Sequence, residues 1–335
     1  MNTRRTEIDI VYKGVNISKD LSPYLLSFTY NDNEGKSDEI QLDLEDRQRK
    51  WQGPWLPGKG DSIKASIVQQ NWKKSGDTQK LDCGTFFVDD VSFKGPPDMI
   101  SIKALSVPFP SGGKDTEHTR HWENTTLSSI LGDVAGSSEL SLMYDAPSFL
   151  YDRVDQVRET DLSFAKRVAK KEGLAVKVSK NQLIVYSEVD YEGKSPIRTI
   201  TRGRDDVKSY SFNFTAAEQE YKTVEVSYFD DTKKKQIKYV YSVPGVEKGP
   251  TLRVNKRAKS VEEAKRWAKA EARAKNKGSK TGKITMIGDV NLYQGSTVKV
   301  KGFGAFDGKY YIETSSHRVT GGYSTELNLR EVLNY

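Results

Sequence analysis

Hydrophobic and polar residues alternate along much of the first hundred residues. Five short segments show the alternation: 8–12, 26–30, 40–44, 63–67 and 100–104. A period of two predicts β-strands that have one buried face and one face in water. Because turn-forming sequences rich in Gly, Pro, Asn and Asp separate these segments, we expect a small antiparallel barrel or sandwich in this part of the chain.

The pattern changes in the middle of the chain. Residues 108–124 hold prolines, glycines and many polar residues, which predicts a linker. Apolar residues then recur every three or four positions in two segments, and this spacing predicts helices. The first helix follows an N-cap at Thr126, and the second covers about 161–172 after an N-cap at Thr160. A hairpin over 175–186 completes a small α+β unit.

Alternation returns in the last third of the chain, in the segments 210–214, 224–228 and 237–243. A long alanine-rich helix then interrupts the sheet that these segments predict. Its start carries the capping-box pattern, in which Ser260 and Glu263 each satisfy a backbone N–H of the first turn. Alternating strands resume after the helix and continue to the C-terminus.

These elements together predict an α+β fold that is mainly β. We expect a first antiparallel β-barrel domain over 1–110, an α+β insert domain over 111–200, and a second β-barrel domain over 201–335. The hairpin and the long helix, at about 230–280, would be an insertion in the second barrel. The lengths and spacing of the predicted strands are similar in the two β regions, as they would be after a duplication.

The composition is that of a globular chain. Of the 335 residues, 36% are hydrophobic and 30% are charged. No apolar run approaches the ~20 residues that a membrane-spanning helix needs, and the charged N-terminal sequence lacks the apolar core of a signal peptide. The single cysteine, Cys83, excludes an intrachain disulfide and indicates synthesis in a reducing compartment.

The positive charge of the chain is local. The net charge of the chain is +7. The segment 256–283, with eleven Lys or Arg and three Glu, has a net charge of +8, so the other residues sum to −1. The cations of the long helix that could contact a partner, a channel or nucleic acid are Lys265, Arg266, Lys269 and Arg273. A second candidate contact is the hairpin tip with Lys233, Lys234 and Lys235. Interspersed glutamates, together with a charge distribution that suits the helix dipole, disfavour direct nucleic-acid binding.

Residues for catalysis are scarce. The chain has three histidines, of which His118 and His121 fall in the expected linker and lack a third metal ligand. Cys83 precedes an apolar strand, where a small core residue is the ordinary interpretation. Paired carboxylates such as Asp89 and Asp90 lie at strand ends or turns, where Asp is common. The sequence therefore predicts no catalytic residue, no metal site and no cofactor.

Several stretches resemble the late-control-D family of phage tail proteins, the baseplate hub of contractile tails. They are KSDEIQLDLEDRQRKW at 36–51, GKGDSIKASI at 58–67, TTLSSILGDVAG at 125–136, ETDLSFAKRVAKKEGLAVKVSKNQLIVYS at 159–187 and GSTVKVKGFGAFDGKYYIETSSHRVTGGYSTELNLREV at 295–332. The resemblance covers roughly residues 5–333. It looks closest to the hubs of Gram-positive prophage-like tails and R-type bacteriocins.

The resemblance implies a structural role. Members of the family have two barrels related to the tail-tube subunit, and three chains form a ring with pseudo-sixfold symmetry. Such a ring joins the hexameric tail tube to the trimeric spike, and it also contacts baseplate wedge proteins. It is assembled in the host cytoplasm and ends in the baseplate of a virion or phage-tail-like particle. The resemblance implies no catalytic residue, no cofactor and no membrane partner.

Two alternatives from other functional classes stay open. A tail-associated enzyme that cleaves peptidoglycan would need a paired acid or a Cys–His site. A nucleic-acid-contacting module would use the basic segment 256–283, and its binding would depend strongly on salt concentration.

Overall fold

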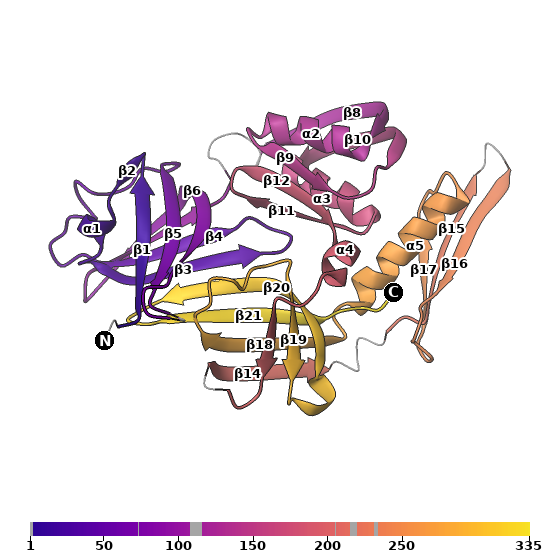
Figure 1. The fold of residues 1–335 in the computed structure, drawn as a ribbon. Helices are drawn as coiled ribbons and strands as arrows, with labels where there is room; N and C mark the ends of the chain where they lie inside the picture. The colour runs from indigo at the N-terminus through magenta and orange to yellow at the C-terminus, as the bar shows by residue number, and fades with distance from the viewer. Residues whose placement is uncertain (1–2, 73, 108–115, 205, 215–219, 231–233) are drawn as a thin grey trace.

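The computed structural model describes residues 3–72, 74–107, 116–204, 206–214, 220–230 and 234–335. Within them the fold is α+β and mainly β, as the alternation predicts. One 13-stranded sheet forms the body of the molecule, and one two-stranded and two three-stranded sheets accompany it. Figure 1 shows the N-terminal strands at one side, the insert above the central strands, and a small sheet with a long helix at the other side.

The central sheet joins the N-terminal and C-terminal β regions. Its main path is β14-β18-β21-β20-β3-β4-β7-β6-β5-β1-β2. Off this path, β19 pairs with β20, and β13 pairs with β19. Its strands are β1 (Arg5–Tyr12), β2 (Val15–Asn16), β3 (Leu25–Asn33), β4 (Glu39–Glu45), β5 (Ser62–Gln70), β6 (Thr78–Lys94), β7 (Met99–Leu105), β13 (Arg198–Thr201), β14 (Val207–Phe214), β18 (Lys280–Ile287), β19 (Thr297–Lys301), β20 (Gly308–Val319) and β21 (Tyr323–Glu331).

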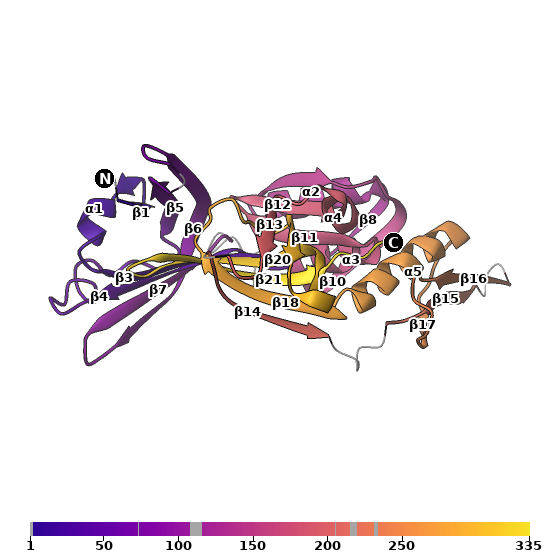
Figure 2. The ribbon, with the colours of Figure 1, turned by 60° about the horizontal axis from the view of Figure 1, so that its bottom comes forward.

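The two β regions meet edge to edge through β3 and β20. These strands pair antiparallel from Asn33 opposite Thr314 to Phe28 opposite Val319. Figures 1 and 2 both show β3 beside β20 in the middle of the molecule. The expectation of two separate barrel domains does not include this pairing, because the pairing joins residues that lie almost 300 positions apart in the chain.

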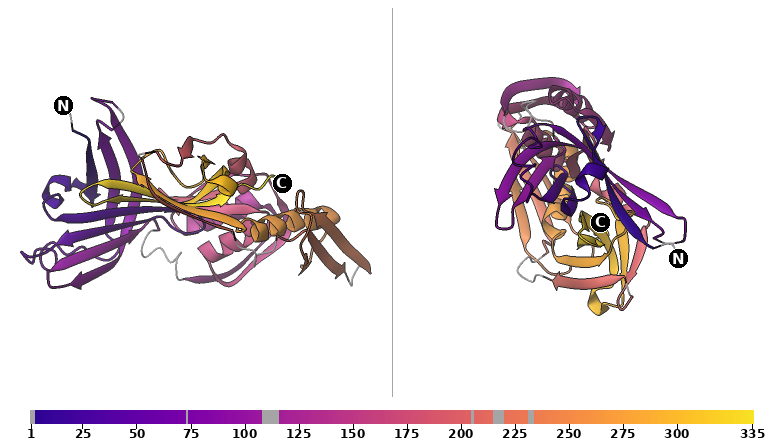
Figure 3. Two further views of the ribbon diagram at one scale, coloured as in Figure 1. Left: turned by 90° about the horizontal axis from the view of Figure 1, so that it is seen from below. Right: turned by 90° about the vertical axis from the view of Figure 1, so that its left-hand side faces the viewer.

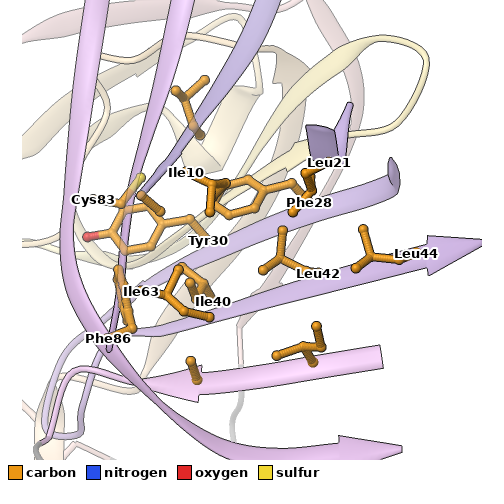
Figure 4. Packing of buried hydrophobic residues seen from close by; sticks show 14 of the residues in the cluster. Ile10, Leu21, Phe28, Tyr30, Ile40, Leu42, Leu44, Ile63, Cys83 and Phe86 are labelled. Carbon is orange, nitrogen blue, oxygen red and sulfur yellow. The ribbon is translucent and has the colours of Figure 1, made fainter. Parts of the chain in front are cut away.

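One face of the central sheet is apolar and buried. In the N-terminal region, Tyr30, Ile40, Ala104 and Val88 lie opposite one another across four neighbouring strands, and all four are buried. Figure 4 shows how the apolar side chains of this core pack together, with the short helix α1 (Ser18–Leu21) contributing Leu21. Each of the five alternating segments expected before residue 105 lies in a strand of this sheet.

The opposite face of the same sheet is polar. Residues directly opposite one another across paired strands share a face, and the register therefore builds rows of polar side chains. One row is Thr29, Gln41, Lys103 and Asp90, and a second row is Asn31, Ser316, Glu326 and Thr285. The second row crosses the join, where Ser316 Oγ donates a hydrogen bond to Asn31 Oδ1 at 2.6 Å.

The insert contains three helices, and local capping defines the start of the two longer ones. Its elements are β8 (Glu117–Thr126), α2 (Leu127–Ser137), β9 (Ser141–Asp145), β10 (Leu150–Thr160), α3 (Asp161–Lys171), β11 (Leu174–Ser179), β12 (Gln182–Ser187) and α4 (Glu188–Gly193). Thr126 Oγ1 accepts a hydrogen bond from the N–H of Ser129, and Thr160 Oγ1 accepts one from the N–H of Ser163. Both predicted N-caps are confirmed, as is the hairpin of β11 and β12.

The linker prediction is wrong for its second half. Residues 117–126 form strand β8, which pairs antiparallel with β10, while 108–115 lie outside the described residues. The segment EHTRHWENTT alternates half-buried and exposed positions, but only Trp122 among the half-buried ones is strongly apolar. A strand with so few apolar side chains looks like a loop until its partner is known.

The long helix and three of the late strands form a separate unit. The helix α5 (Val261–Asn276) packs on a three-stranded sheet of β15 (Thr223–Asp230), β16 (Lys235–Ser242) and β17 (Thr251–Asn255). The expectation that 224–228 and 237–243 share a sheet with 210–214 is therefore wrong. Trp267 and its neighbouring alanines cover this small sheet, so the apolar stripe of the helix and the apolar face of the strands bury each other. The left view in Figure 3 agrees with Figures 1 and 2 that this unit lies away from the N-terminal strands.

The capping box of α5 is confirmed with one difference. Ser260 Oγ accepts a hydrogen bond from the N–H of Glu263 at 3.1 Å. The Glu263 carboxylate reaches back one residue further than expected, and it accepts from the N–H of Lys259 at 2.6 Å.

Two glycine substitutions should change stability in opposite directions. A Cβ at Gly288 would lie 2.1 Å from Tyr323 Cδ1, and the buried Tyr323 ring is held by a 2.6 Å hydrogen bond between its hydroxyl and His317. Gly288→Ala should therefore cost about 1–3 kcal/mol through overpacking. At Gly136, in α2, a Cβ would meet nothing within 4 Å, and Gly136→Ala should stabilise the helix by about 0.5–1 kcal/mol.

Thermal unfolding followed by circular dichroism would measure both changes. An unchanged melting temperature for Gly288→Ala would contradict the close contact with Tyr323.

Candidate functional site

A buried cluster of charges lies where the insert, the central sheet and α5 meet. At its centre is Arg330 of β21, whose side chain is fully buried. Its guanidinium donates hydrogen bonds to Glu192 Oε1 at 2.6 Å and to Glu188 Oε2 at 3.0 Å, both from α4. Its Nε lies 3.2 Å from Glu313 Oε1 of β20, and the group stacks 4.3 Å above the Tyr311 ring. Although burial opposes the charge, Glu192 and Glu188 raise the pKa of Arg330.

The helix α5 and its C-cap residue, Lys277, add two further cations to this cluster. Arg273 donates a hydrogen bond to Glu192 Oε2 at 2.6 Å, and Lys277 Nζ lies 3.2 Å from Glu188 Oε1. Each of these two glutamates therefore binds two cations. We call the residues Glu34, Glu188, Glu192, Arg273, Lys277, Glu313 and Arg330 the junction cluster. Buried charges of this kind are stable only when each has partners, so the cluster fixes how α4, α5, β20 and β21 sit together.

Glu34 is the least satisfied member of the junction cluster. Its Oε1 is buried and has no hydrogen-bond partner among the described residues. Burial, followed by the charge of Glu188, raises the pKa of Glu34 to about 7, although Lys277 and Arg330 oppose the shift. Burial also raises the pKa of Glu313. Part of the negative charge in the cluster is thus lost near neutral pH.

A second buried ion pair attaches the insert to the first half of the central sheet. Lys177 of β11 contacts Asp32 of β3, and its Nζ lies 3.1 Å from Asp38 Oδ1. Burial opposes the charge of Lys177, but Asp32 and Asp38 raise its pKa. Asp32 also accepts a hydrogen bond from the N–H of Gln294 at 2.9 Å. The insert is therefore anchored at two places.

The cations singled out on the helix have different surroundings. Arg266 donates a hydrogen bond to the fully buried Glu172 at 2.9 Å, and Arg273 belongs to the junction cluster. Both arginines are thus bound by carboxylates of the chain itself, and a contact of either with a partner or channel stays a prediction. Lys265 and Lys269 make no ion pair with a described residue, and Lys269 lies exposed with its Nζ 5.8 Å from the centre of the Tyr241 ring.

At the hairpin tip, Lys234 and Lys235 are exposed, and Lys233 lies outside the described residues. A contact between these lysines and a partner stays a prediction.

The residues considered as catalytic or metal-binding candidates are either buried in the cores or paired with other side chains. His317 is fully buried, and burial lowers its pKa to about 4. Cys83 is buried, which raises its pKa. His118, in β8 rather than in a loop, lies 3.0 Å from Asp161, which also binds Arg120. Among the described residues there is no group of three or more His, Cys, Asp or Glu that could hold a metal ion, and none of the helices is long and apolar enough to cross a membrane.

Sequence reasoning did not find Arg330, Glu188 or Glu192. Arg330 follows Leu329 in an alternating strand, where a charged residue ordinarily marks the face in water. Nothing in the strand itself shows that α4 and α5 cover this face. The two glutamates lie just after a predicted hairpin, without a pattern of their own.

Comparison with known proteins gives the family. A family model for the phage tail baseplate hub (GPD) matches residues 112–323, which is more than half of the chain. The chain belongs to the phage tail baseplate hub family. The resemblance stated from the sequence is therefore confirmed. Members of this family are structural components of the phage tail baseplate.

Two curated relatives are probable baseplate hub proteins of Escherichia phages. The chain is 27% identical to the one from phage 186 over 202 residues, which are 58% of this chain and 49% of the relative. It is 31% identical to the one from phage P2 over 199 residues, which are 57% and 48% of the two chains. The chain thus spans about half the length of these relatives. A closer relation to Gram-positive tails or R-type bacteriocins stays a prediction.

Solved structures show the hub fold at low identity. A tail protein from Neisseria meningitidis MC58 aligns with a TM-score of 0.73 and 14% identity over 98% of both chains. A type VI secretion system component of E. coli aligns with a TM-score of 0.55 and 9% identity, over 98% of this chain and 76% of that one.

Removing the central cation of the hub's junction cluster should be strongly destabilising. Arg330→Met keeps an unbranched apolar stem but leaves Glu188 and Glu192 with one cation fewer in a buried place. We expect a loss of about 3–5 kcal/mol, seen as a lower melting temperature. The matched control is Lys283→Met, which removes a half-exposed pair with Glu326 and should cost less than about 1 kcal/mol. Equal losses in the two variants would show that Arg330 is not a central partner.

Glu34 makes the stability of the hub depend on pH. Its pKa is raised when folded, so the folded chain holds a proton that the unfolded chain has lost between about pH 4.5 and 7. This group therefore costs stability progressively as the pH rises through that window. The free energy of unfolding of the Glu34→Gln variant, relative to that of the natural chain, should therefore rise by about 1–3 kcal/mol between pH 5 and pH 8. Melting temperatures across this range would test it, and a constant difference between the two proteins would rule out the assignment.

Proposed function

We propose that this chain is the hub of a contractile tail, in which three copies form a ring with pseudo-sixfold symmetry. The ring would join a hexameric tail tube to a trimeric spike. The observation that carries the proposal is the edge-to-edge pairing of β3 with β20. Each half of the central sheet would belong to one tube-like barrel, and this pairing would be the intrachain form of the contact that also joins neighbouring copies.

Free strand edges support a contact between copies. Strand β14 ends the central sheet, pairs only with β18 among the described strands, and is exposed over most of its length. The last residues of β6, 90–94, pair with β7 and have no second described strand paired beside them. An edge of one copy that pairs with a different edge of the next gives a head-to-tail contact, which closes into a ring when the rotation is right.

The polar face of the central sheet supports a central channel. Its polar rows continue from one half of the sheet to the other across β3 and β20. In a ring built from three such sheets, this face would line the lumen and stay in water, while the apolar face packs against the outer parts of each barrel. A lumen of this kind suits passage of a hydrophilic cargo.

The partners would be the tail tube, the spike and the baseplate wedge proteins. The likeness to a type VI secretion system component supports a place in a contractile injection machine, because that protein is described as structurally similar to tail proteins of bacteriophage T4. The buried charges of the junction cluster bind one another, which suits a structural rather than a catalytic role. Assembly in the host cytoplasm would precede incorporation into the particle.

Electron microscopy of the purified chain, alone and together with its spike, tests the ring. We expect threefold class averages with a central hole. The variant Phe214→Glu places a charge on β14, where Phe214 is 64% exposed, and it should prevent ring formation while leaving the melting temperature unchanged. Val157→Glu, at an equally exposed valine of β10 (63%), should still form rings. A monomer with and without the spike would overturn the proposal, and a clear band on a cell-wall zymogram would instead favour the peptidoglycan-cleaving alternative.

A further inference from the structure

A wide groove separates the insert from the start of α5. It has a volume of about 770 Å³, and β10 and α3 form one side of it while the segment before α5 and the first turns of that helix form the other. Its charged lining residues are Asp152, Arg153, Asp155, Arg167, Lys171, Arg257, Lys259, Glu263 and Arg266. Figure 1 shows β10 and α5 away from β14, so this surface is separate from the strand edges of the proposed ring.

Cations outnumber carboxylates in this groove, and some of them lack a carboxylate partner. Lys171 and Arg257 form no ion pair with a described residue. Lys171 Nζ lies 5.6 Å from the centre of the Trp267 ring, and the Arg257 guanidinium lies 5.8 Å from that of Tyr228. Burial, followed by the charges of Arg167 and Lys256, lowers the pKa of Lys171. The groove therefore holds positive charge that the chain itself does not neutralise.

We infer that the groove between β10 and α5 binds an acidic segment of a partner protein, whose carboxylates pair with Lys171 and Arg257. Charge complementarity favours an anionic occupant, because such a partner would relieve the repulsion among the unpaired cations. Asp152, Asp155 and Glu263 interrupt the positive field, which suits separate carboxylates better than a continuous row of phosphates. Leu150, which is 72% exposed at the edge of the groove, offers an apolar contact next to the charged positions, as a peptide side chain would need.

The inference goes beyond the proposed ring and does not depend on it. A chain that formed no ring would still present the groove, since the insert and α5 belong to one copy. Conversely, the ring could form through β14 and β6 with the groove empty.

The test uses the full chain and a fluorescein-labelled peptide of eight glutamates as the probe. Binding is followed by fluorescence anisotropy at low and at physiological salt. We expect salt-sensitive binding that weakens at least tenfold in the double variant Lys171→Glu/Arg257→Glu. The matched control is Lys64→Glu/Lys301→Glu, which changes the net charge equally at exposed positions outside the groove and should stay within twofold of the natural chain.

Several outcomes would overturn the inference. The first is an absence of peptide binding, and the second is equal weakening of binding by the two double variants. The third is that an oligothymidylate of similar charge binds more tightly than the peptide and that Lys171→Glu/Arg257→Glu abolishes this binding. The third result would assign the groove to nucleic acid. If the charge-reversed chain does not fold, Lys171→Gln/Arg257→Gln takes its place. The same comparison with the control applies, and at least a fivefold weakening is expected.

Discussion

The burial of one guanidinium constrains most of this molecule. Arg330 is fully removed from water, and a charge in that position is tolerated only with close partners of opposite sign. Those partners come from α4 and β20, and α5 adds further cations that bind the same glutamates. The insert, the central sheet and the long helix must therefore be in place together. The junction cluster explains how small units with separate apolar cores act as one body.

The central sheet has a complementary role. Its apolar face builds the cores, and its polar face runs without interruption from one half of the chain to the other. Because the apolar face is buried and the polar face would line the proposed channel, the strand edges remain for pairing with neighbouring copies. This arrangement suits the proposed ring, which would present similar surfaces around an axis and keep a hydrophilic interior. The junction cluster covers one end of this face, around Arg330 of β21.

The basic segment of the chain has two separate roles in the folded molecule. Arg266 and Arg273 are bound by Glu172 and Glu192, so they attach α5 to the rest of the chain. Arg257, with Lys171 from the insert, leaves positive charge at the surface groove. A single stretch of basic sequence thus contributes both to internal cohesion and to a surface for a partner, and only the packing of α5 against the insert separates the two.

The sequence by itself determined what depends on neighbouring residues. The alternating strands, the helices after Thr126, Thr160 and Ser260, and the hairpin of β11 and β12 all follow from patterns and hydrogen bonds within a few positions. The sequence motifs also gave the family. Only the tertiary structure decided that β8 is a strand, that β3 pairs with β20, and that β15 and β16 leave the central sheet. It alone brought Arg330 to glutamates about 140 positions away, because the burial of a charge depends on what covers it, and no local pattern records that.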